Sequence, residues 1–418
     1  MAGLGAGVTA LALAFTLVPE APQAMTVTDT TLVFHLRSFY YDGTQNTGGQ
    51  NEAWTGGGWL AYRSGWLSNA FAAGATLYGS APLYAPEDKD GTFLLKPGQE
   101  GYLVLGEAYA ALRYRDDAVF KLYRQQVDQG YINPSDIRMT PNTFEGATVG
   151  GVIRDVRYLA GYLWRVKQWN ADEFVSMAEK AGAGESDAGV GLIGVQLAPL
   201  QALRFDVHEQ YGFDTFNTLY VKGDYRRALS AAWTVAMGAE FTDQRAVGDA
   251  LVINAASRMW RTRVGGGRVQ LIHRDLTLTT AFSVTASGND IQNPWGTYPG
   301  YLSLFDAPAS QGFARANEEG WLVGAVYDFS RLGASGLVGA VNFARGTDAI
   351  DPESRASAPD QTEYNFKIDY LVPWRPWGSS RDLRLTVREA FYDREGFDLA
   401  HQLHVILNWE WDVLNRGR

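Results

Sequence analysis

The sequence predicts an all-β fold: a closed antiparallel transmembrane β-barrel of about 18 strands, with long extracellular loops and short periplasmic turns. The main observation is a repeated alternation of apolar and polar residues. In 201–211, for example, Leu203 and Phe205 alternate with Arg204 and Asp206. Successive side chains of a strand point to opposite faces, so each such segment has one apolar face. No helical block covers these faces, and no internal run reaches the roughly 18 apolar residues of a spanning helix. Lipid is the cover that fits, with the polar faces turned toward a lumen.

The composition limits the class of protein. The chain has 418 residues, 46% of them hydrophobic and 13% aromatic, with 46 glycines. Aromatic residues are typical of the interfacial girdles of a barrel, and glycine of its turns and twisted strands. Cysteine is absent, which excludes disulfides and thiolate metal sites. A net charge of −10 argues against a nucleic-acid partner, because nucleic-acid binding needs a basic surface.

The N-terminal segment differs from the rest of the chain. Residues 2–18 are apolar and compatible with a helix, and Pro-Glu-Ala-Pro-Gln-Ala follows them. We interpret 1–24 as a secretory signal peptide, which leaves 25–418 as a single barrel domain. The alternative, a membrane-anchoring helix, is disfavoured because the apolar run is short.

Strand candidates then follow one another to the C-terminus. They are 30–42, 54–64, 69–80, 100–115, 117–128, 146–154, 157–168, 188–198, 201–211, 216–226, 230–243, 264–273, 275–286, 320–330, 335–345, 362–372, 382–393 and 401–412. Their number is even, as expected for a barrel with both termini in the periplasm. Many are close to the roughly ten residues that a tilted strand needs to cross a bilayer.

The connections between these strands alternate in length. The short ones include 115–117, 198–200, 274–275 and 331–334. The long ones are 43–53, 81–99, 129–145, 169–187, 244–263, 287–319 and 346–361. If residue 30 lies near the periplasm, the long connections fall outside the cell, which is the usual arrangement in outer-membrane barrels.

Parity assigns each strand a lipid face and a lumen face. In 30–42, Phe34 and Leu36 point outward, which turns Arg37 inward. Near the C-terminus the outward positions are apolar or aromatic: Tyr364, Phe366, Ile368, Tyr370, Leu383, Leu385, Val387, Leu403, Val405, Leu407, Trp409 and Trp411. The inward positions carry basic residues: Arg37, Arg157, Arg165, Arg204, Arg226, Lys367, Arg384 and Arg388. An arginine on the lipid face costs about 2–4 kcal/mol at the bilayer midplane, so this separation supports the assignment.

A ladder of inward basic residues is suited to carboxylates. Guanidinium is permanently charged and presents a planar fork to both carboxylate oxygens. Several weak, spaced contacts let an anion enter and move on without being trapped. The alternative is that the basic residues pair with inward acids and only fill the lumen; the acids are Asp206, Asp224, Glu240 and Asp369.

Several segments carry recognisable motifs. They are LRSFY at 36–40, DIRMTPNTFEG at 136–146, NPWGTYPGY at 293–301 and WLVGAVYDF at 321–329. In this order they resemble the OprD family of substrate-specific outer-membrane porins. The resemblance implies an 18-stranded barrel around one lumen, in which the loop at 129–145 folds inward and narrows the pore.

The resemblance also implies roles for particular residues. Arg37, Arg384 and Arg388 match inward basic positions, and Arg138 matches the arginine of the constriction loop. An acidic pocket is expected from Asp136, Asp290 and Asp306. Family substrates are small water-soluble molecules that usually carry a carboxylate, such as amino acids and organic acids. Two features depart from the family pattern: a polar tail follows Trp411, and 244–263 holds extra basic residues, namely Arg245, Arg258, Arg261 and Arg263.

We therefore expect a passive channel in the bacterial outer membrane, without a cofactor, a metal or a catalytic step. Its expected partners are small anionic or zwitterionic solutes, outer-membrane lipid and the barrel-assembly machinery. The alternative is a barrel enzyme of the lipase or protease type, for which Asp206 and His208 share a face but no serine nucleophile can be assigned. A soluble all-β binding protein would not keep so much apolar surface on one parity.

Overall fold

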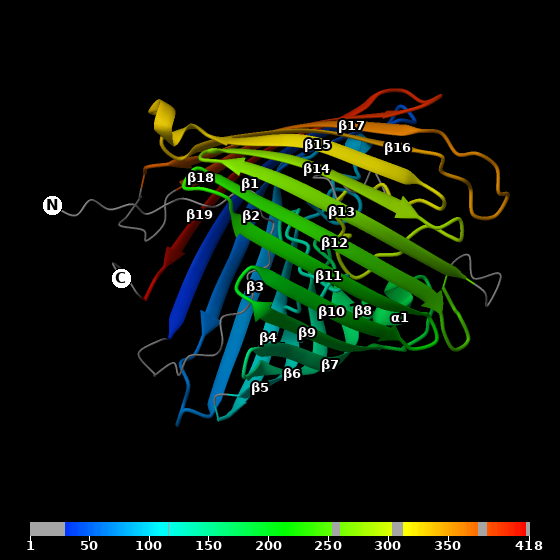
Figure 1. Cartoon of the computed structure of the whole chain (residues 1–418). Coiled ribbons are helices and arrows are strands. Elements are labelled where there is room, and N and C mark those ends of the chain that lie inside the picture. The colour runs from blue at the N-terminus through cyan, green and yellow to red at the C-terminus, as the bar shows by residue number, and fades with distance from the viewer. Residues whose placement is uncertain (1–29, 116, 253–259, 303–311, 375–382, 415–418) are drawn as a thin grey trace.

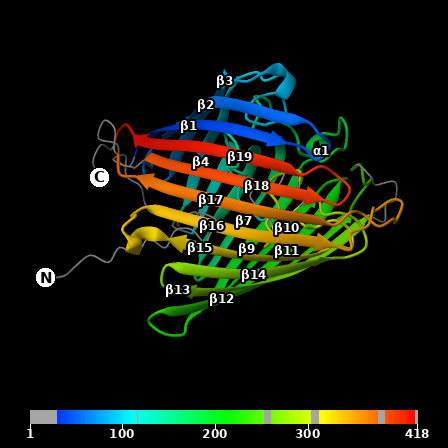
Figure 2. The same ribbon diagram turned by 90° about the horizontal axis from the view of Figure 1, so that it is seen from above.

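One closed sheet forms the wall of the molecule (Figure 1). The computed structural model describes residues 30–115, 117–252, 260–302, 312–374 and 383–414. Within these residues the sheet has 19 antiparallel strands, of which β8 has only two residues, so that eighteen strands build the barrel. The ring closes where β1 pairs with β19, from Val33 opposite Asp412 to Gly43 opposite Gln402 (Figure 2).

The strands follow the chain order around the ring. They are β1 (Thr31–Thr44), β2 (Gln50–Arg63), β3 (Phe71–Tyr84), β4 (Tyr102–Tyr114), β5 (Ala118–Gln125), β6 (Thr143–Ile153), β7 (Val156–Lys167), β8 (Val175–Ser176), β9 (Val190–Leu200), β10 (Leu203–Gly212), β11 (Phe216–Ala228), β12 (Trp233–Ala246), β13 (Arg261–His273), β14 (Leu276–Thr285), β15 (Glu319–Asp328), β16 (Leu337–Thr347), β17 (Gln361–Val372), β18 (Leu383–Arg394) and β19 (Ala400–Asp412).

In the part of the chain that the structure describes, helical structure is confined to short pieces in the connections. They are η2 (Glu87–Lys89), α1 (Met177–Lys180) and η3 (Phe329–Leu332). No helix among the described residues is long and apolar enough to cross a membrane. The predicted signal peptide at 1–24 lies outside the described residues.

The predicted alternation of short and long connections is present. The turns 154–155 and 274–275 lie at the end where β1 begins, whereas 126–142 and 286–318 leave the opposite end. One long connection was overestimated: 43–53 shrinks to 45–49, because β1 and β2 remain paired up to Thr44 and Gln50. The loop expected at 129–145 is 126–142, because β5 ends earlier and β6 begins earlier than expected. The loop expected at 244–263 is 247–260, because β12 and β13 extend further.

The two faces of the wall differ as parity predicts. On β17, Phe366 and Ile368 are 49% and 52% exposed, whereas Glu363 and Asn365 are each 2% exposed. The exposed side chains form the outer apolar surface, and the buried ones face a filled interior. An apolar outer band with a polar inner face is the arrangement of a barrel in a membrane.

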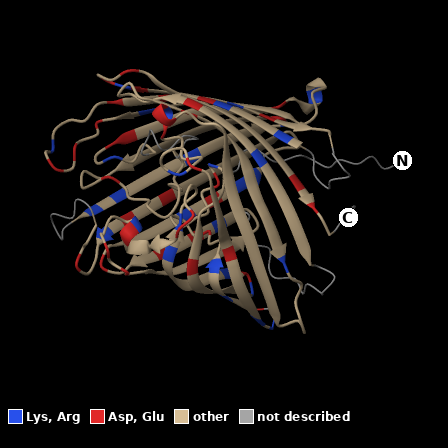
Figure 3. Ribbon diagram, turned by 180° about the vertical axis from the view of Figure 1, so that it is seen from behind, with Lys and Arg blue, Asp and Glu red and all other residues tan. Residues whose placement is uncertain are grey.

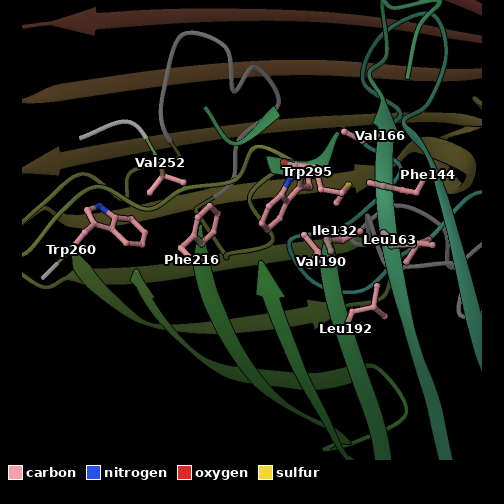
Figure 4. Packing of buried hydrophobic residues seen from close by; sticks show 12 residues of the cluster. Ile132, Phe144, Leu163, Val166, Val190, Leu192, Phe216, Val252, Trp260 and Trp295 are labelled. Carbon is pink, nitrogen blue, oxygen red and sulfur yellow. Dashed lines mark hydrogen bonds between the residues drawn. The ribbon is translucent and has the colours of Figure 1, made fainter. Parts of the chain in front are cut away.

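The extracellular part of the lumen holds three inward loops, 126–142, 168–189 and the described residues of 286–318, namely 286–302 and 312–318. Ile132, Met177 and Trp295, one from each loop, belong to a buried cluster that also includes Leu163 and Phe216 of the wall (Figure 4). The ring of Trp295 stacks on Phe216 with centroids 4.9 Å apart. The apolar residues of these loops therefore anchor them to the wall and place their polar residues in the remaining passage.

Candidate functional site: the lumen constriction

A cavity in the lumen, which we call the constriction, lies between the loop 126–142 and the wall made by β1, β17, β18 and β19. The loop contributes Asp136, Ile137 and Arg138, and the cavity between the two sides encloses about 530 Å³, including its opening to solvent. The wall contributes Arg37, Phe39, Lys367, Asp369, Arg384, Thr386, Arg388, Ile406 and Asn408. The lining thus has five basic residues against two acidic ones, which gives the constriction an excess of positive charge.

Arg37 fastens the loop to the wall. Its Nη1 donates to Oδ1 of Asp136 (2.7 Å) and its Nη2 to Oδ2 (3.1 Å), which is a bidentate ion pair. Nη1 also donates to the carbonyl of Arg138 (2.5 Å), and Nε donates to Asn408 (2.7 Å). Arg37 is only 7% exposed, so most of its hydrogen-bonding capacity is used inside the protein.

Asp136 is the acidic partner on the loop. Its side chain is 45% exposed toward the passage. Surrounding protein raises the pKa of Asp136, but the guanidinium of Arg37 lowers it more, so its pKa lies below the usual value. The carboxylate therefore stays charged at neutral pH and keeps the pair with Arg37 intact.

The opposite side of the passage is a patch of basic side chains on β17 and β18. Lys367 lies beside Arg388 in the strand register, and Leu371 lies beside Arg384. Lys367 pairs with Asp369 (Nζ to Oδ2, 2.7 Å), whose other oxygen accepts from the hydroxyl of Thr386 (2.5 Å). Lys367 is thus paired with an inward acid, as the lumen-filling alternative predicts. The lining as a whole still has more basic than acidic groups.

Arg138, in the loop 126–142, is fully buried beside the cavity. Its Nη1 donates to the carbonyl of Ile137 (3.1 Å), and its guanidinium carbon lies 5.6 Å from the centre of the Tyr41 ring. Arg37, on β1, binds the backbone carbonyl of Arg138 and so holds this residue close to the wall. The side chain of Arg138 therefore lines the cavity although it is buried.

A second group of predicted residues lies on another part of the wall. Arg157 on β7 and Asp206 on β10 are both paired in register with Gln196 of β9. Asp206 accepts from Gln196 (2.5 Å) and forms an ion pair with Arg204 (3.4 Å). Arg226 lies apart from them at the exposed end of β11. Charges of both signs follow the strands around the lumen (Figure 3).

Two more predicted site residues, Arg165 and Asp290, are not among those that line the constriction. A bulge in β7 between Leu163 and Arg165 breaks the alternation that placed Arg165 inside, and the side chain is exposed next to Glu145 in the register. Asp290 accepts from the backbone N–H of Ala316 (2.7 Å) and so holds its own loop together. Asp306 lies outside the described residues.

Sequence reasoning placed Asp224 and Glu240 on the lumen face but missed Arg268 and the polar cluster that these residues form on β11, β12 and β13. Arg268 pairs with Asp224 (3.1 Å), and Glu240 accepts from the backbone N–H of Tyr301 (2.7 Å). Lys222 lies 3.7 Å from Asp224. Even parity in these strands could have identified Arg268, since Lys222, Asp224 and Glu240 share its face; the contact with Tyr301 depends on the path of 286–318.

The inward loops are joined to one another by specific hydrogen bonds. Oδ1 of Asn133 accepts from the backbone N–H of Thr297 (3.0 Å), and its Nδ2 donates to the carbonyl of Thr297 (2.9 Å). Nε1 of Trp295 donates to the carbonyl of Met177 (2.9 Å). These contacts make the three loops one assembly around the passage, which fixes the constriction more firmly than the ion pair of Arg37 alone.

The comparisons with known proteins agree with this fold. Among curated proteins, none matches the chain by sequence. Solved structures with the same fold include OccK9 (OpdG) of Pseudomonas aeruginosa, with 17% identity, a TM-score of 0.80, and coverage of 93% of this chain and 99% of that one. OpdK of Pseudomonas aeruginosa, solved with vanillate, has 19% identity, a TM-score of 0.79, and coverage of 92% and 99%.

A third similar structure is OccAB3 of Acinetobacter baumannii, with 15% identity, a TM-score of 0.81, and coverage of 92% of this chain and 100% of that one. These likenesses establish the fold, and the sequence profile establishes the family. The profile described as outer membrane porin, OprD family, matches residues 26–413. The chain therefore belongs to the OprD family of outer-membrane porins and is a protein of the bacterial outer membrane.

Proposed function

We propose that this porin is a passive, selective channel for small water-soluble carboxylates, such as organic acids or amino acids. The observation that carries the proposal is the charge of the constriction, where five basic side chains and two acidic ones line one cavity. A positive site between low-dielectric walls raises the local concentration of anions, which favours their entry. No energy source and no chemical step are part of this proposal.

The basic groups of the constriction have different parts in this proposal. Arg37 is held by Asp136 and Asn408, so it shapes the passage and contributes a fixed charge. Arg384 is exposed and Arg388 is half-buried on the wall facing the loop, so both guanidinium groups line the path of a passing carboxylate. An anion can move from one to the other while each contact stays weak enough to break, as conduction requires.

The carboxylate of Asp136 gives the constriction a second polarity. It lies on the loop side, opposite the basic patch of β17 and β18. A zwitterion could place its carboxylate toward Arg384 or Arg388 and its ammonium toward Asp136. An aromatic carboxylate is a sensible first probe, because OpdK, a protein of the same fold, was solved with vanillate.

The geometry disfavours the enzyme alternative. A hydrolase would need His208 to be oriented by Asp206 and to contact a nucleophile. Instead Nδ1 of His208 is hydrogen-bonded to Gln129 (2.8 Å), and Asp206 bonds to Gln196 and Arg204. His208 is thus engaged with the inward loop 126–142, and Asp206 is engaged with neighbouring residues of the wall.

Single-channel recording in a planar bilayer tests the proposal. We expect anion selectivity and concentration-dependent block by vanillate or a small organic acid. The variant Arg384→Gln/Arg388→Gln should lose most of the block and shift toward cation selectivity. A matched control, Arg274→Gln/Arg331→Gln, removes the same charge from turns outside the constriction and should behave like the wild type. Cation selectivity of the wild type, or block that survives the lumen variant, would overturn the proposal.

A further inference from the structure

The extracellular end of β12 and β13 carries an unusual group of charges on the outer surface. Asp243 and Arg245 end β12, and Arg261 and Arg263 begin β13; Asp243 is paired with Arg263 in register, and Arg245 with Arg261. The residues that alternate with them are buried and point inward: Thr242 bonds to Tyr131 (2.9 Å), and Gln244 donates to the carbonyl of Gln292 (2.7 Å). The four charged side chains therefore share the outward face.

The position of this group along the strands places it at the edge of the apolar band. Phe241, two residues before Asp243 on the same face, is 41% exposed, and Val284 of the adjacent β14 is 49% exposed. The loop 247–260 follows directly beyond Ala246. The guanidinium groups are thus next to lipid-facing side chains, at the depth where charged heads meet the polar part of a membrane.

The charges within the group do not balance. Nε and Nη2 of Arg261 (3.1 and 2.5 Å) and Nε of Arg263 (2.8 Å) all donate to Oδ2 of Asp243. One carboxylate thus serves two arginines, and Arg245 adds a third positive charge opposite Arg261. The side chains of Arg261 and Arg263 remain 47% and 50% exposed.

Like charges facing each other on paired strands are destabilising unless an anion lies between them. Two further acids, Asp214 and Asp249, stand in the loops above, where Oδ1 of Asp214 accepts from the backbone N–H of Asp249 (3.3 Å). The excess positive charge is therefore a property of the strand pair itself. Arginine forks match phosphate oxygens in a bidentate way, so phosphate is the anion that this face fits best.

We propose that Arg245, Arg261 and Arg263 form a binding site for the phosphate groups of an anionic glycolipid in the outer leaflet. The lipid would lie against Phe241 and Val284 with its acyl chains while its phosphates contact the three guanidinium groups. This assignment gives a role to Arg245, Arg261 and Arg263, which lie on the outward face and do not line the lumen. It concerns the outer surface and is independent of which solute the channel passes.

Native mass spectrometry of the purified barrel tests the site, with bisphosphorylated lipid A as the probe. The wild type should retain the lipid, and Arg245→Gln/Arg261→Gln/Arg263→Gln should bind it about 100-fold more weakly. This factor is the product of the roughly 5-fold loss of affinity expected for each of the three basic residues near an anionic surface. The matched control, Arg115→Gln/Arg274→Gln/Arg331→Gln, removes three exposed charges from the opposite end and should bind as the wild type does.

Further binding measurements distinguish a lipid phosphate from free phosphate, and loss of the site from misfolding of the variant. The same glycolipid without phosphates should bind as weakly to the wild type as lipid A does to the glutamine variant. An excess of inorganic phosphate should not displace lipid A, because the acyl chains add contacts that free phosphate lacks. A lysine version of the triple variant keeps the charge and should bind with intermediate strength. Unchanged binding by the glutamine variant, equal binding of the phosphate-free lipid, or full displacement by phosphate would overturn the proposal.

Discussion

Replacing Asp136 by asparagine should loosen the loop that narrows the lumen. The substitution keeps the size of the side chain but removes the charge that forms two hydrogen bonds with Arg37. The bond from Arg37 to the carbonyl of Arg138 remains, so the loop should not detach completely. Arg37→Gln removes both attachments and should have the larger effect.

The size of the effect can be worked out from the geometry. A hydrogen bond between charged groups contributes about 1.5–3 kcal/mol when it is shielded from water. Because the side chain of Asp136 is 45% exposed, solvent screening reduces this contribution, and we take about 1–2 kcal/mol for the pair. The population of the loosened loop should therefore rise roughly 5- to 30-fold in Asp136→Asn.

Single-channel recording should show this as a larger mean conductance with more frequent transitions between levels. A double-mutant cycle with Arg37→Gln provides the decisive comparison. Once Arg37 is absent, Asp136 has lost its partner, so adding Asp136→Asn should change nothing further. Additive effects of the two substitutions, or wild-type conductance in Asp136→Asn, would refute the clamp. Arg274→Gln, in a turn outside the lumen, serves as the control.

The pH dependence of the clamp has a defined sign. The pKa of Asp136 lies below its usual value, because the pair with Arg37 outweighs the effect of burial. A depressed carboxyl pKa gives stability that is present above the unfolded value of about 3.9 and is lost as the pH falls through the folded value. The clamp should therefore hold at neutral and mildly acidic pH and fail only below about pH 4.

Three further predictions concern the inward loops. Burial raises the pKa of Asp128 to about 6, so this carboxyl loses its negative charge as the pH falls through that value. The reversal potential of the wild type should therefore shift toward anion selectivity between pH 7 and pH 5. The same shift between these pH values in Asp128→Asn would contradict this assignment. Asn133→Ala leaves the N–H of Thr297 without its acceptor, and hydrogen exchange there should accelerate roughly 5- to 30-fold, since such a bond is worth about 1–2 kcal/mol. Trp295→Ala removes a fully buried ring and should cost about 3–5 kcal/mol, seen as a lower transition in heat-modified gel mobility. Trp321→Ala, on the exposed outer face, is the matched control and should shift the transition less.

The wall was predictable from the sequence because parity is a local property. A residue such as Ile368 must face lipid if Lys367 and Asp369 face water, and this choice repeats along every strand. Strand ends were predicted within a few residues, except where pairing continued into an expected loop, as between β1 and β2. Parity failed at Arg165, because a one-residue bulge between Leu163 and Arg165 breaks the alternation at that position and leaves no clear mark in the sequence.

The constriction was only partly predictable, because it depends on contacts between distant segments. The sequence indicated that Arg37 faces the lumen, but not that it would bind the carboxylate of Asp136 and the carbonyl of Arg138. The buried pair of Arg315 and Glu318 (2.7 Å) has no signal in the alternation, since both residues belong to a long loop. Such pairs form because a loop that folds into a closed interior must satisfy its charges there.

The pairing of β1 with β19 has a consequence for biogenesis. The first strand finds its final neighbour only when the last one arrives, so the cylinder cannot seal before nearly the whole polypeptide has been exported. Until then, both terminal strands carry unsatisfied backbone groups that invite pairing with other chains. A product that stops short of β19 would keep these two open edges permanently, and aggregation rather than insertion would be its expected fate.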